Sequence, residues 1–217
     1  MNIVYLILAR AGSKRVKNKN LRKIKNKSLV EYSIEFAKKV SKIDKIILST
    51  DSEKIRKLGI KKGLFIPELR PKKLSKSNTS SYQSARYEIA RYEKINKKID
   101  AIILIQPSTP YRSLRTFKKL KNIFIKDQSK PLISVKKISL RSDKLLKKRK
   151  NFITSYDSKK KETVYIPNGA YFFISRNHLI KNKSFFSKKM NFYEIRNLKE
   201  NIDIDTKDDL FLARKIF

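Results

Sequence analysis

The residues best suited to chemistry in this 217-residue chain lie in a basic segment near its start. Four cations, Arg10, Lys14, Arg15 and Lys19, fall within ten residues around Gly12. Cationic side chains and the backbone N–H groups of a tight glycine turn can bind phosphate. Glycine is scarce here, with 4 residues where ordinary usage of about 7% would give roughly 15, which favours a backbone role for Gly12. The segment lacks the Walker and G-x-G-x-x-G patterns, so a phosphate site and an ordinary basic loop both stay open.

A second candidate group is the carboxylate pair Asp203 and Asp205. The pair alternates with two isoleucines, so in a strand both carboxylates would project from one face while the isoleucines face the core. Mg²⁺ takes one or two carboxylates and completes its shell with water and phosphate oxygens. The alternative is that this segment only starts the last helix. A capping box of Thr206 and Asp209 would provide that start and would leave Asp203 without a structural role.

Together, the basic loop and the carboxylate pair predict phosphoryl or nucleotidyl transfer, in which a protein positions reactants and neutralises developing charge. A Ser-His-Asp hydrolase is disfavoured, because the sole histidine, His178, follows a strand among polar residues and is read as a surface residue.

Alternating apolar and amphipathic segments predict the scaffold that positions these groups. Strands are expected over residues 3–8, 45–49, 101–106, 132–135, 168–174 and 190–195. Helices are expected over 28–40, 52–59, 82–97, 113–126 and 210–216. This alternation indicates an α/β fold with a mostly parallel sheet flanked by helices. Ligands bind such sheets at the carboxyl ends of the strands, where the basic loop falls.

Length and composition predict a single domain over residues 1–217, with a lysine-rich excursion from the sheet over about 136–165. The chain has no cysteine, its apolar run over 3–9 is too short to cross a membrane, and no basic segment precedes that run as in a signal peptide. We therefore expect a cytoplasmic protein with no membrane partner.

The net charge of +36 allows a different class, a basic nucleic-acid-binding protein. The cations are mostly lysines spread from end to end, and abundant Ile, Asn and Lys with scarce Gly are what AT-rich coding would produce. We expect non-specific polyanion binding in vitro at this charge, but no specific nucleic-acid partner.

Six short motifs, in order along nearly the whole chain, resemble those of the acylneuraminate cytidylyltransferases, the CMP-sialic acid synthetases. The motifs are LARAGSK…KNL (8–21), ILSTD (47–51), LRP (69–71), QPSTPYR (106–112), PNGA (167–170) and DIDT (203–206). Each motif is modestly specific alone, but six in sequence are strongly so. The resemblance implies a nucleotidyltransferase-like, Rossmann-like fold, a homodimer, and Mg²⁺-dependent transfer of CMP from CTP to an acidic nine-carbon sugar with release of pyrophosphate.

The resemblance also implies roles for individual residues. The groups expected to bind the nucleotide are Arg10, Gly12, Ser13, Lys14, Lys19, Asn20, Arg70 and Ser81. Of these, Arg10 and Lys19 would act in catalysis, together with Asp205. The groups expected to bind the sugar are Gln106, Lys144, Asn168, Phe172, Phe185 and Phe186, partly across the dimer. Mg²⁺ would be held by Asp203 and Asp205, with Asp205 as the more direct ligand.

The departures from the family pattern concern the sugar more than the nucleotide. Lysines 159–161 stand where an arginine usually faces the sugar carboxylate, Phe172 replaces a tyrosine, Ser77 replaces an aspartate, and the proline before Lys19 is missing. The acceptor therefore stays open among N-acetylneuraminate, legionaminate and pseudaminate. A sibling enzyme for 3-deoxy-manno-octulosonate, or one using another nucleotide, is the alternative within the same chemistry.

Overall fold

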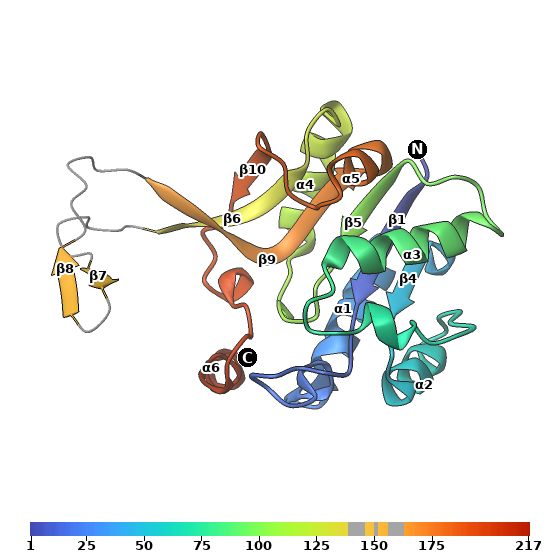
Figure 1. The fold of residues 1–217 in the computed structure, drawn as a ribbon. Coiled ribbons are helices and arrows are strands. Elements are labelled where there is room, and N and C mark those ends of the chain that lie inside the picture. The colour runs from blue at the N-terminus through green and yellow to red at the C-terminus, as the bar shows by residue number, and fades with distance from the viewer. Residues whose placement is uncertain (139–145, 150–151, 156–162) are drawn as a thin grey trace.

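The computed structural model of the chain describes residues 1–138, 146–149, 152–155 and 163–217 (Figure 1). Its centre is a six-stranded sheet with helices packed on both faces. This arrangement confirms the α/β fold predicted from the alternation of apolar and amphipathic segments.

The strands lie in the order β10-β6-β9-β5-β1-β4 across the sheet. Their bounds are Ile3–Leu8 (β1), Ile46–Ser49 (β4), Ala101–Leu104 (β5), Leu132–Ile138 (β6), Val164–Ser175 (β9) and Asn191–Glu194 (β10). Within this sheet only β9 runs against the rest, antiparallel to both of its neighbours, β5 and β6. The parallel strands β4, β1 and β5 are adjacent, so their carboxyl ends meet at one edge of the sheet.

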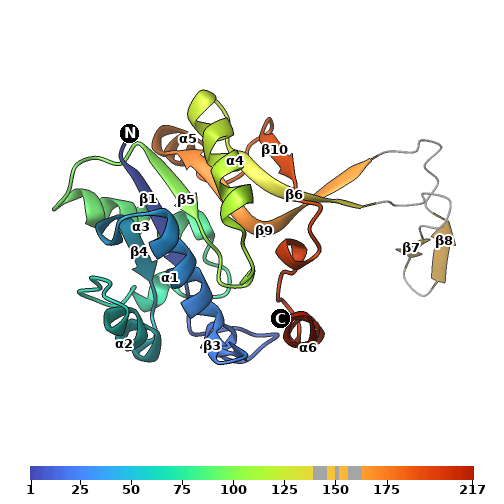
Figure 2. The same cartoon turned by 180° about the vertical axis from the view of Figure 1, so that it is seen from behind.

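The helices are Leu29–Val40 (α1), Glu53–Lys61 (α2), Ser81–Glu93 (α3), Leu114–Lys126 (α4), Arg176–Asn182 (α5) and Lys207–Ile216 (α6). Apolar residues of α1 and α4 join one core cluster, and those of α3 and α5 join a second one, because successive strand residues face opposite sides. Figure 1 shows α3 and α5 in front of the sheet, and Figure 2 shows α1 and α4 covering the other face.

Helix ends follow the predicted signals in most cases. Thr206 and Asp209 form the predicted capping box at the start of α6, and Ser28 and Glu31 form another at the start of α1. The predicted end of α2 at Gly59 is wrong, since the helix continues to Lys61. Gly59 serves packing instead: a Cβ there would lie 2.5 Å from the Ile66 side chain.

The strand predicted over residues 168–174 is part of the longer strand β9, which is kinked at Gly169. Gly169 has φ +78°, and the pairing of β6 with β9 shifts register between Ile133 and Val135. The Ser134 side chain fills the gap in the ladder, since its Oγ accepts from the Tyr171 N–H at 2.9 Å. A long reversed strand thus bends at Gly169 and brings its backbone to the edge where the parallel strands end.

Outside the main sheet, β2 (Lys23–Ile24) pairs with β3 (Lys27–Ser28), and β7 (Leu146–Arg149) pairs with β8 (Phe152–Ser155). The predicted excursion over 136–165 is shorter than expected, because β6 continues to Ile138 and β9 begins at Val164. The ends of β6 and β9 extend away from the body toward the β7–β8 pair (Figure 1). In the part of the chain that the structure describes, no helix is long and apolar enough to span a membrane.

A third core cluster joins the two ends of the chain. Its buried residues are Val16, Ile24, Leu29, Ile202, Ile204, Leu210 and Ala213. The segment before α6 therefore packs against the region that follows the basic loop. The prediction that both isoleucines beside the carboxylate pair are buried is confirmed.

The prediction that the carboxylate pair lies in a strand is wrong. Residues 202–205 form no ladder with any described strand, and the Ile204 N–H donates to the Ser108 carbonyl at 2.8 Å instead. Residues 202–205 are extended but lie outside the sheet. Their alternating side chains bury the two isoleucines, but the two carboxylates do not lie in one pocket.

Candidate active site

A cavity of about 630 Å³ opens where β1, β4 and β5 end. Of the predicted site residues, it is lined by Arg10, Ser13, Lys14, Lys19, Asn20, Arg70, Ser81, Gln106 and Asp205. The structure thus brings together, at one sheet edge, groups that span almost two hundred residues of sequence. This placement matches the general rule for ligand sites of open parallel sheets.

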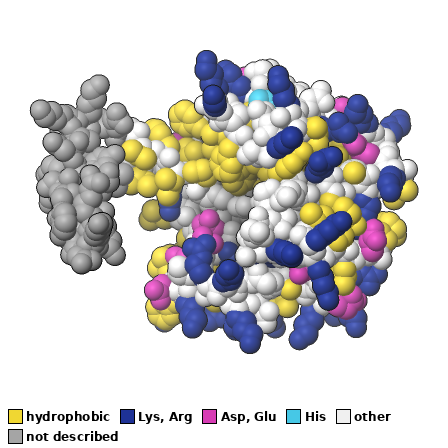
Figure 3. All heavy atoms as spheres, viewed as in Figure 1, with side chains coloured by type: hydrophobic (Ala, Val, Ile, Leu, Met, Phe, Trp, Pro, Cys, Tyr) yellow, Lys and Arg dark blue, Asp and Glu magenta, His cyan; other side chains and the backbone are white. Residues whose placement is uncertain are grey.

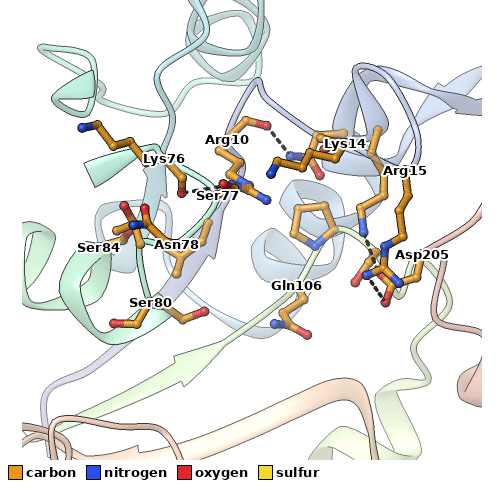
Figure 4. Close-up of a pocket in the computed structure, with 18 of the residues that line it drawn as sticks. Arg10, Lys14, Arg15, Lys76, Ser77, Asn78, Ser80, Ser84, Gln106 and Asp205 are labelled. Carbon is orange, nitrogen blue, oxygen red and sulfur yellow. Dashed lines mark hydrogen bonds and ion pairs between the residues drawn. The ribbon is translucent and has the colours of Figure 1, made fainter. Parts of the chain in front are cut away.

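Two banks of side chains face each other across this cavity in Figure 4. One bank carries Lys14, Arg15 and Asp205, and the other carries polar residues of the segment from Lys76 to Ser84. Arg10 joins them, since its Nη1 donates to the Lys76 carbonyl at 3.0 Å. One wall is therefore strongly cationic, while the facing wall offers hydroxyl and amide groups.

Asp205 pairs with two cations of the basic bank, the partly buried Lys19 and the exposed Arg15. Lys19 Nζ lies 2.9 Å from Asp205 Oδ1 and also donates to the Ile204 carbonyl at 2.8 Å. Arg15 Nη2 lies 2.9 Å from Asp205 Oδ2. Burial raises the pKa of Asp205, but the hydrogen bond and charge of Lys19, helped by Arg15, outweigh burial and hold that pKa below its ordinary value.

The basic loop is fastened by neutral and acidic side chains. Asn20 is buried, and its Nδ2 donates to the Arg10 carbonyl at 2.8 Å. The Ala11 N–H donates to Asp51 Oδ1 at 2.8 Å. These bonds fix the backbone that carries the cations.

Gly12 does not itself line the cavity, and its backbone does not require glycine. Positive φ among the described glycines occurs at Gly63 and Gly169, and a Cβ on Gly12 would meet no atom within 4 Å. The structural reason predicted for this glycine, a tight turn, is therefore wrong.

Arg70 reaches the cavity from behind, although only 4% of its surface is exposed. Its Nε donates to Ser75 Oγ at 3.1 Å, its Nη1 donates to Ser49 Oγ at 3.4 Å, and its Nη2 lies 3.9 Å from Asp51 Oδ1. Burial lowers the pKa of Arg70, and the Asp51 carboxylate opposes that shift. This guanidinium is held rigidly at the base of the cavity.

A second cavity of about 350 Å³ adjoins the first. Both are lined by Ser80, Ser81 and Gln106. The second is mostly apolar and is lined by Tyr82, Leu104, Pro167, Gly169, Phe172, Phe185 and Phe186, with Lys183, Ser184 and Asp203 as its polar members. The Phe172 ring packs edge-on to Phe185 and Phe186, with centroids at 6.4 and 5.6 Å.

Arg112 holds the wall between the cavities. Its Nε donates to the Ala170 carbonyl at 2.9 Å, and its Nη2 donates to the Gln106 carbonyl at 2.6 Å and to Thr109 Oγ1 at 2.7 Å. Thr109 Oγ1 in turn donates to the Gly169 carbonyl at 3.1 Å. Burial lowers the pKa of Arg112 to about 10, so the side chain stays cationic near neutral pH.

The two carboxylates predicted as a pair occupy different cavities. Asp205 lines the first and Asp203 the second, where a Cβ on Gly169 would lie 3.1 Å from Asp203 Oδ2. Burial raises the pKa of Asp203, and its Oδ1 is buried without a hydrogen-bond partner among the described residues. The pKa values of these two carboxylates, only two residues apart, are thus shifted in opposite directions.

This donor set fits a hard divalent ion such as Mg²⁺. The described residues contain no group of three or more His, Cys, Asp or Glu side chains suited to a metal. Mg²⁺ is commonly held by one or two carboxylates with water and substrate phosphates supplying the rest. The orphaned Oδ1 of Asp203 and the carboxylate of Asp205 could serve such an ion only with a phosphate present.

Not every predicted substrate residue lines a cavity. Asn168 is buried behind the second cavity, where its Oδ1 accepts from Ser134 Oγ at 2.6 Å and its Nδ2 donates to Asn201 Oδ1 at 2.8 Å. These contacts brace the kink of β9. Lys144 and lysines 159–161 lie outside the described residues. His178 is half-buried on α5 and lines neither cavity.

Sequence reasoning missed several groups at the site. Lys183 lines the second cavity from the end of α5 with φ +51°, and no motif pointed to it. Ser80 caps α3 and lines both cavities. Arg15 stood in the basic cluster, but its pairing with Asp205 depends on a contact 190 residues away along the chain.

Comparisons with known proteins agree with this geometry. A family model described as "Cytidylyltransferase" matches residues 4–216. The CMP-N,N'-diacetyllegionaminic acid synthase of Legionella pneumophila is 30% identical over 100% of this chain and 96% of that protein. The pseudaminic acid cytidylyltransferase of Campylobacter jejuni is 27% identical over 100% of this chain and 97% of that protein. The N-acylneuraminate cytidylyltransferase of Escherichia coli is 28% identical over 97% of this chain, which spans 51% of that relative.

Two solved structures share the fold. A CMP:2-keto-3-deoxy-manno-octonic acid synthetase complexed with CTP superposes with a TM-score of 0.71 at 16% identity, covering 100% of this chain and 98% of that one. A 4-diphosphocytidyl-2C-methyl-D-erythritol synthase from Anaerococcus prevotii gives a TM-score of 0.65 at 15% identity, covering 99% and 97%. The predicted nucleotidyltransferase-like fold is confirmed, and the match over 4–216 shows that this chain belongs to the cytidylyltransferase family.

Proposed function

We propose that this cytidylyltransferase moves CMP from CTP to a nonulosonic acid, an acidic nine-carbon 2-keto sugar. The anomeric hydroxyl oxygen attacks the α-phosphorus, and the bond from that phosphorus to the oxygen shared with the β-phosphate breaks. Pyrophosphate leaves with the shared oxygen, and the hydroxyl proton passes to solvent. The products are a CMP-sugar and pyrophosphate.

The observation that carries this proposal is the junction between the two cavities. A cationic cavity suited to a triphosphate adjoins an apolar one, and Ser80, Ser81 and Gln106 line both. An α-phosphate in the first cavity and a sugar hydroxyl in the second would meet at this junction. Transfer between two bound substrates gains most of its rate from such positioning.

On the nucleotide side, the proposed roles follow from charge and burial. Arg10, Ser13, Lys14 and Lys19 would bind the triphosphate. Lys19 is the best placed to stabilise developing charge, because it is partly buried and already pairs with an anion, Asp205. Fixed donors in a water-poor site stabilise transition-state charge more than exposed ones do.

The inner end of the cavity would recognise the nucleoside. Asn20, Arg70 and Ser81 are the groups proposed for cytosine and ribose, and all three line the cavity. Arg70 is the best ordered of them, since three different side chains contact its guanidinium.

A divalent cation is part of the proposal. Mg²⁺ would be held by Asp203 and Asp205 together with phosphate oxygens, and when bound it would neutralise charge on the reacting phosphates. Asp205 would then exchange its contacts with Lys19 and Arg15 for the ion, which frees both cations for the triphosphate.

The second cavity suits an acidic sugar that carries apolar substituents. Phe172, Phe185 and Phe186 provide an apolar wall for acyl or methyl groups. Lys183 is the one cation among the described residues that line this cavity, so we propose that it pairs with the sugar carboxylate. The relatives named above act, by name, on legionaminic, pseudaminic and acylneuraminic acids, all members of this acceptor class.

We further propose that the protein is a homodimer. Figure 3 shows a band of hydrophobic side chains crossing the face over β9 toward the extended ends of β6 and β9. On these strands and beside them, Tyr165 and Phe192 stack with centroids at 5.2 Å while 37% and 56% of their surfaces are exposed. Exposed aromatic pairs of this kind mark protein–protein contacts. Light scattering should give twice the chain mass, and Phe192→Ser should shift the protein toward monomer.

The test of the reaction is pyrophosphate release from CTP and Mg²⁺ across a panel of nonulosonic acids and 3-deoxy-manno-octulosonate, at moderate salt. We expect turnover with a nonulosonic acid, loss of turnover on adding EDTA, and little activity with UTP. Turnover with the octulosonate alone would contradict the proposed acceptor class.

The same experiment separates the enzyme from a nucleic-acid-binding protein. Binding to polyanions falls steeply with salt because counterions are released, whereas turnover of CTP should survive moderate salt. A folded protein that neither binds CTP nor turns it over, but binds RNA tightly at moderate salt, would overturn the proposal.

A further inference from the structure

A buried polar cluster lies behind the nucleotide cavity, between β4 and α3. Glu88 of α3 and Ser49 at the end of β4 are each 1% exposed. Neither residue lines a cavity, so neither can touch a bound nucleotide. Arg70, which does line the nucleotide cavity, completes the cluster.

The Ser49 hydroxyl bridges the other two side chains. It donates to Glu88 Oε1 at 2.6 Å and accepts from Arg70 Nη1 at 3.4 Å. A hydroxyl has one proton to give. Because the Ser49 hydroxyl donates its one hydrogen bond to the Glu88 carboxylate, the lone pairs of the Ser49 oxygen point toward the Arg70 guanidinium.

The cluster is also organised by charge. Arg91 Nη2 lies 2.9 Å from Glu88 Oε2, and Arg70 Nη2 lies 3.9 Å from Asp51 Oδ1. Burial raises the pKa of Glu88, and the Ser49 bond and the charges of Arg91 and Arg70 oppose that shift. A buried carboxylate is costly unless paired, so its retention next to a ligand-facing arginine calls for a role.

We propose that Glu88 is a positioning residue that acts through Ser49 to fix the Arg70 guanidinium, and so sets nucleotide affinity and the preference for cytosine over uracil. This inference rests on the proposed function in one respect, that Arg70 contacts the base. Arginine offers donors only. Cytosine presents two adjacent acceptors, O2 and N3, whereas N3 of uracil carries a hydrogen. A guanidinium fixed toward that edge therefore favours cytosine, and one that can move favours it less.

The test compares Glu88→Gln with Glu93→Gln, a matched change on the same helix. Glu93 is bonded to Arg176 through both oxygens at 2.8 Å and lines neither cavity. Both variants should lose thermal stability. Only Glu88→Gln should raise the KM and the calorimetric Kd for CTP, each by about tenfold, while its kcat stays within about twofold of wild type. Only this variant should also lower the ratio of kcat/KM for CTP to kcat/KM for UTP, by about tenfold.

A double-mutant cycle with Arg70→Lys checks the route of the effect. If Glu88 acts through Arg70, the effects of Glu88→Gln and Arg70→Lys on CTP affinity should be far from additive. Additive effects, or equal nucleotide behaviour of Glu88→Gln and Glu93→Gln, would overturn the inference. Should Glu88→Gln fail to fold, Ser49→Ala breaks the same bridge, keeps the Glu88–Arg91 pair, and should give the same loss of selectivity.

Failure of this inference is distinguishable from failure of the proposed function. A wild-type protein that uses CTP, with a Glu88→Gln variant that discriminates UTP equally well, leaves the function standing and removes the role of Glu88. A wild-type protein that binds neither CTP nor UTP by calorimetry contradicts both.

Discussion

The two adjoining cavities are built in different ways. The first is cationic, and most of its wall comes from two continuous stretches of chain, the basic loop after β1 and the segment from Arg70 to Ser84. The second is mostly apolar, and its wall combines the end of β5, the start of α3, the kink of β9, the loop after α5 and the segment before α6. Contiguous charged residues are visible in a sequence, whereas an apolar wall assembled from five separate segments is not.

This contrast suggests how the reaction and its specificity are divided. Charge that must be placed near phosphates is held by a loop fastened at Asn20 and Asp51. The acceptor wall depends on one buried arginine, Arg112, and on side-chain packing. Under the proposed function, a change of acceptor can therefore occur through apolar residues while the basic loop stays the same.

The largest expected effect is on the nucleotide side. Lys19→Ala should lower kcat/KM by about 10³-fold, because removing one preorganised donor to transition-state charge typically costs that much. Steady-state pyrophosphate release measures it, and Lys17→Ala, an exposed neighbour on the same loop, is the control. A loss below tenfold would show that the cationic cavity does not depend on Lys19 for catalysis.

A change at Arg112, in the wall between the cavities, should mainly lower the stability of the protein. Arg112→Met removes three hydrogen bonds from a buried guanidinium, so the free energy of unfolding should fall by about 3 kcal/mol in urea denaturation. The surviving enzyme should show a larger rise in KM for the sugar than for CTP, because Ala170 and Gln106 shape the acceptor side. Arg115→Met, an exposed change on α4, should do neither.

A smaller and more selective effect is expected at the acceptor carboxylate. Lys183→Asn should raise the KM for the sugar about tenfold and leave the KM for CTP unchanged, since it removes one charge-assisted contact. Asparagine suits the left-handed backbone at this position, so the fold should hold. Lys188→Asn, exposed and outside the cavity, is the control; an equal KM change in both variants would mean that general surface charge is responsible.

The smallest effects are expected on the thermal stability of the ligand-free protein when Asp203 or Asp205 is neutralised, and the two changes in Tm should have opposite signs. The raised pKa of Asp203 means that its charge destabilises the fold at neutral pH, so Asp203→Asn should raise Tm by about 2 °C. The lowered pKa of Asp205 means that its charge stabilises the fold, so Asp205→Asn should lower Tm by about the same amount.

Both differences should disappear in acid. The contribution of Asp205 is present above its unfolded pKa near 4 and is lost as pH falls through its lower folded value. The penalty at Asp203 is present above its raised folded pKa and is gone once pH falls below about 4. Thermal melts of the two variants from pH 7 to pH 3 measure this; shifts of the same sign would contradict the opposite environments of the two side chains.

Most of the fold could be predicted because its signals are local. Buried strands such as 3–8 and capped helices such as 28–40 are encoded by short apolar runs and by the Ser28 capping box. The predictions were wrong where contacts between distant parts of the chain determine the local conformation. Gly59 continues α2 because Ile66 packs closely on it, and 202–205 is extended without a neighbouring strand.

The site divides along the same line. The cations of the basic loop could be found by type and spacing and Asn20 by the resemblance to the family, and the structure places them at one cavity. The bracing contacts of Asn168 could not be predicted, because its partners, Ser134 and Asn201, are more than thirty residues away in the chain. Lys183 was not found, although Phe185 and Phe186 beside it were expected to bind the sugar, because it belongs to none of the motifs.

The contact between Lys19 and Asp205 has a consequence for the order of events during synthesis. The two residues are separated by 186 positions, and the isoleucines beside Asp205 pack with residues near the basic loop. Contacts between such distant segments form late and slowly. The early strands and the basic loop leave the ribosome long before Asp205 does. The cations of the basic loop in a growing chain therefore lack the carboxylate that pairs with them in the folded protein. If Asp205 acts as proposed, competence for nucleotide transfer is acquired only when the segment that includes it has emerged and docked.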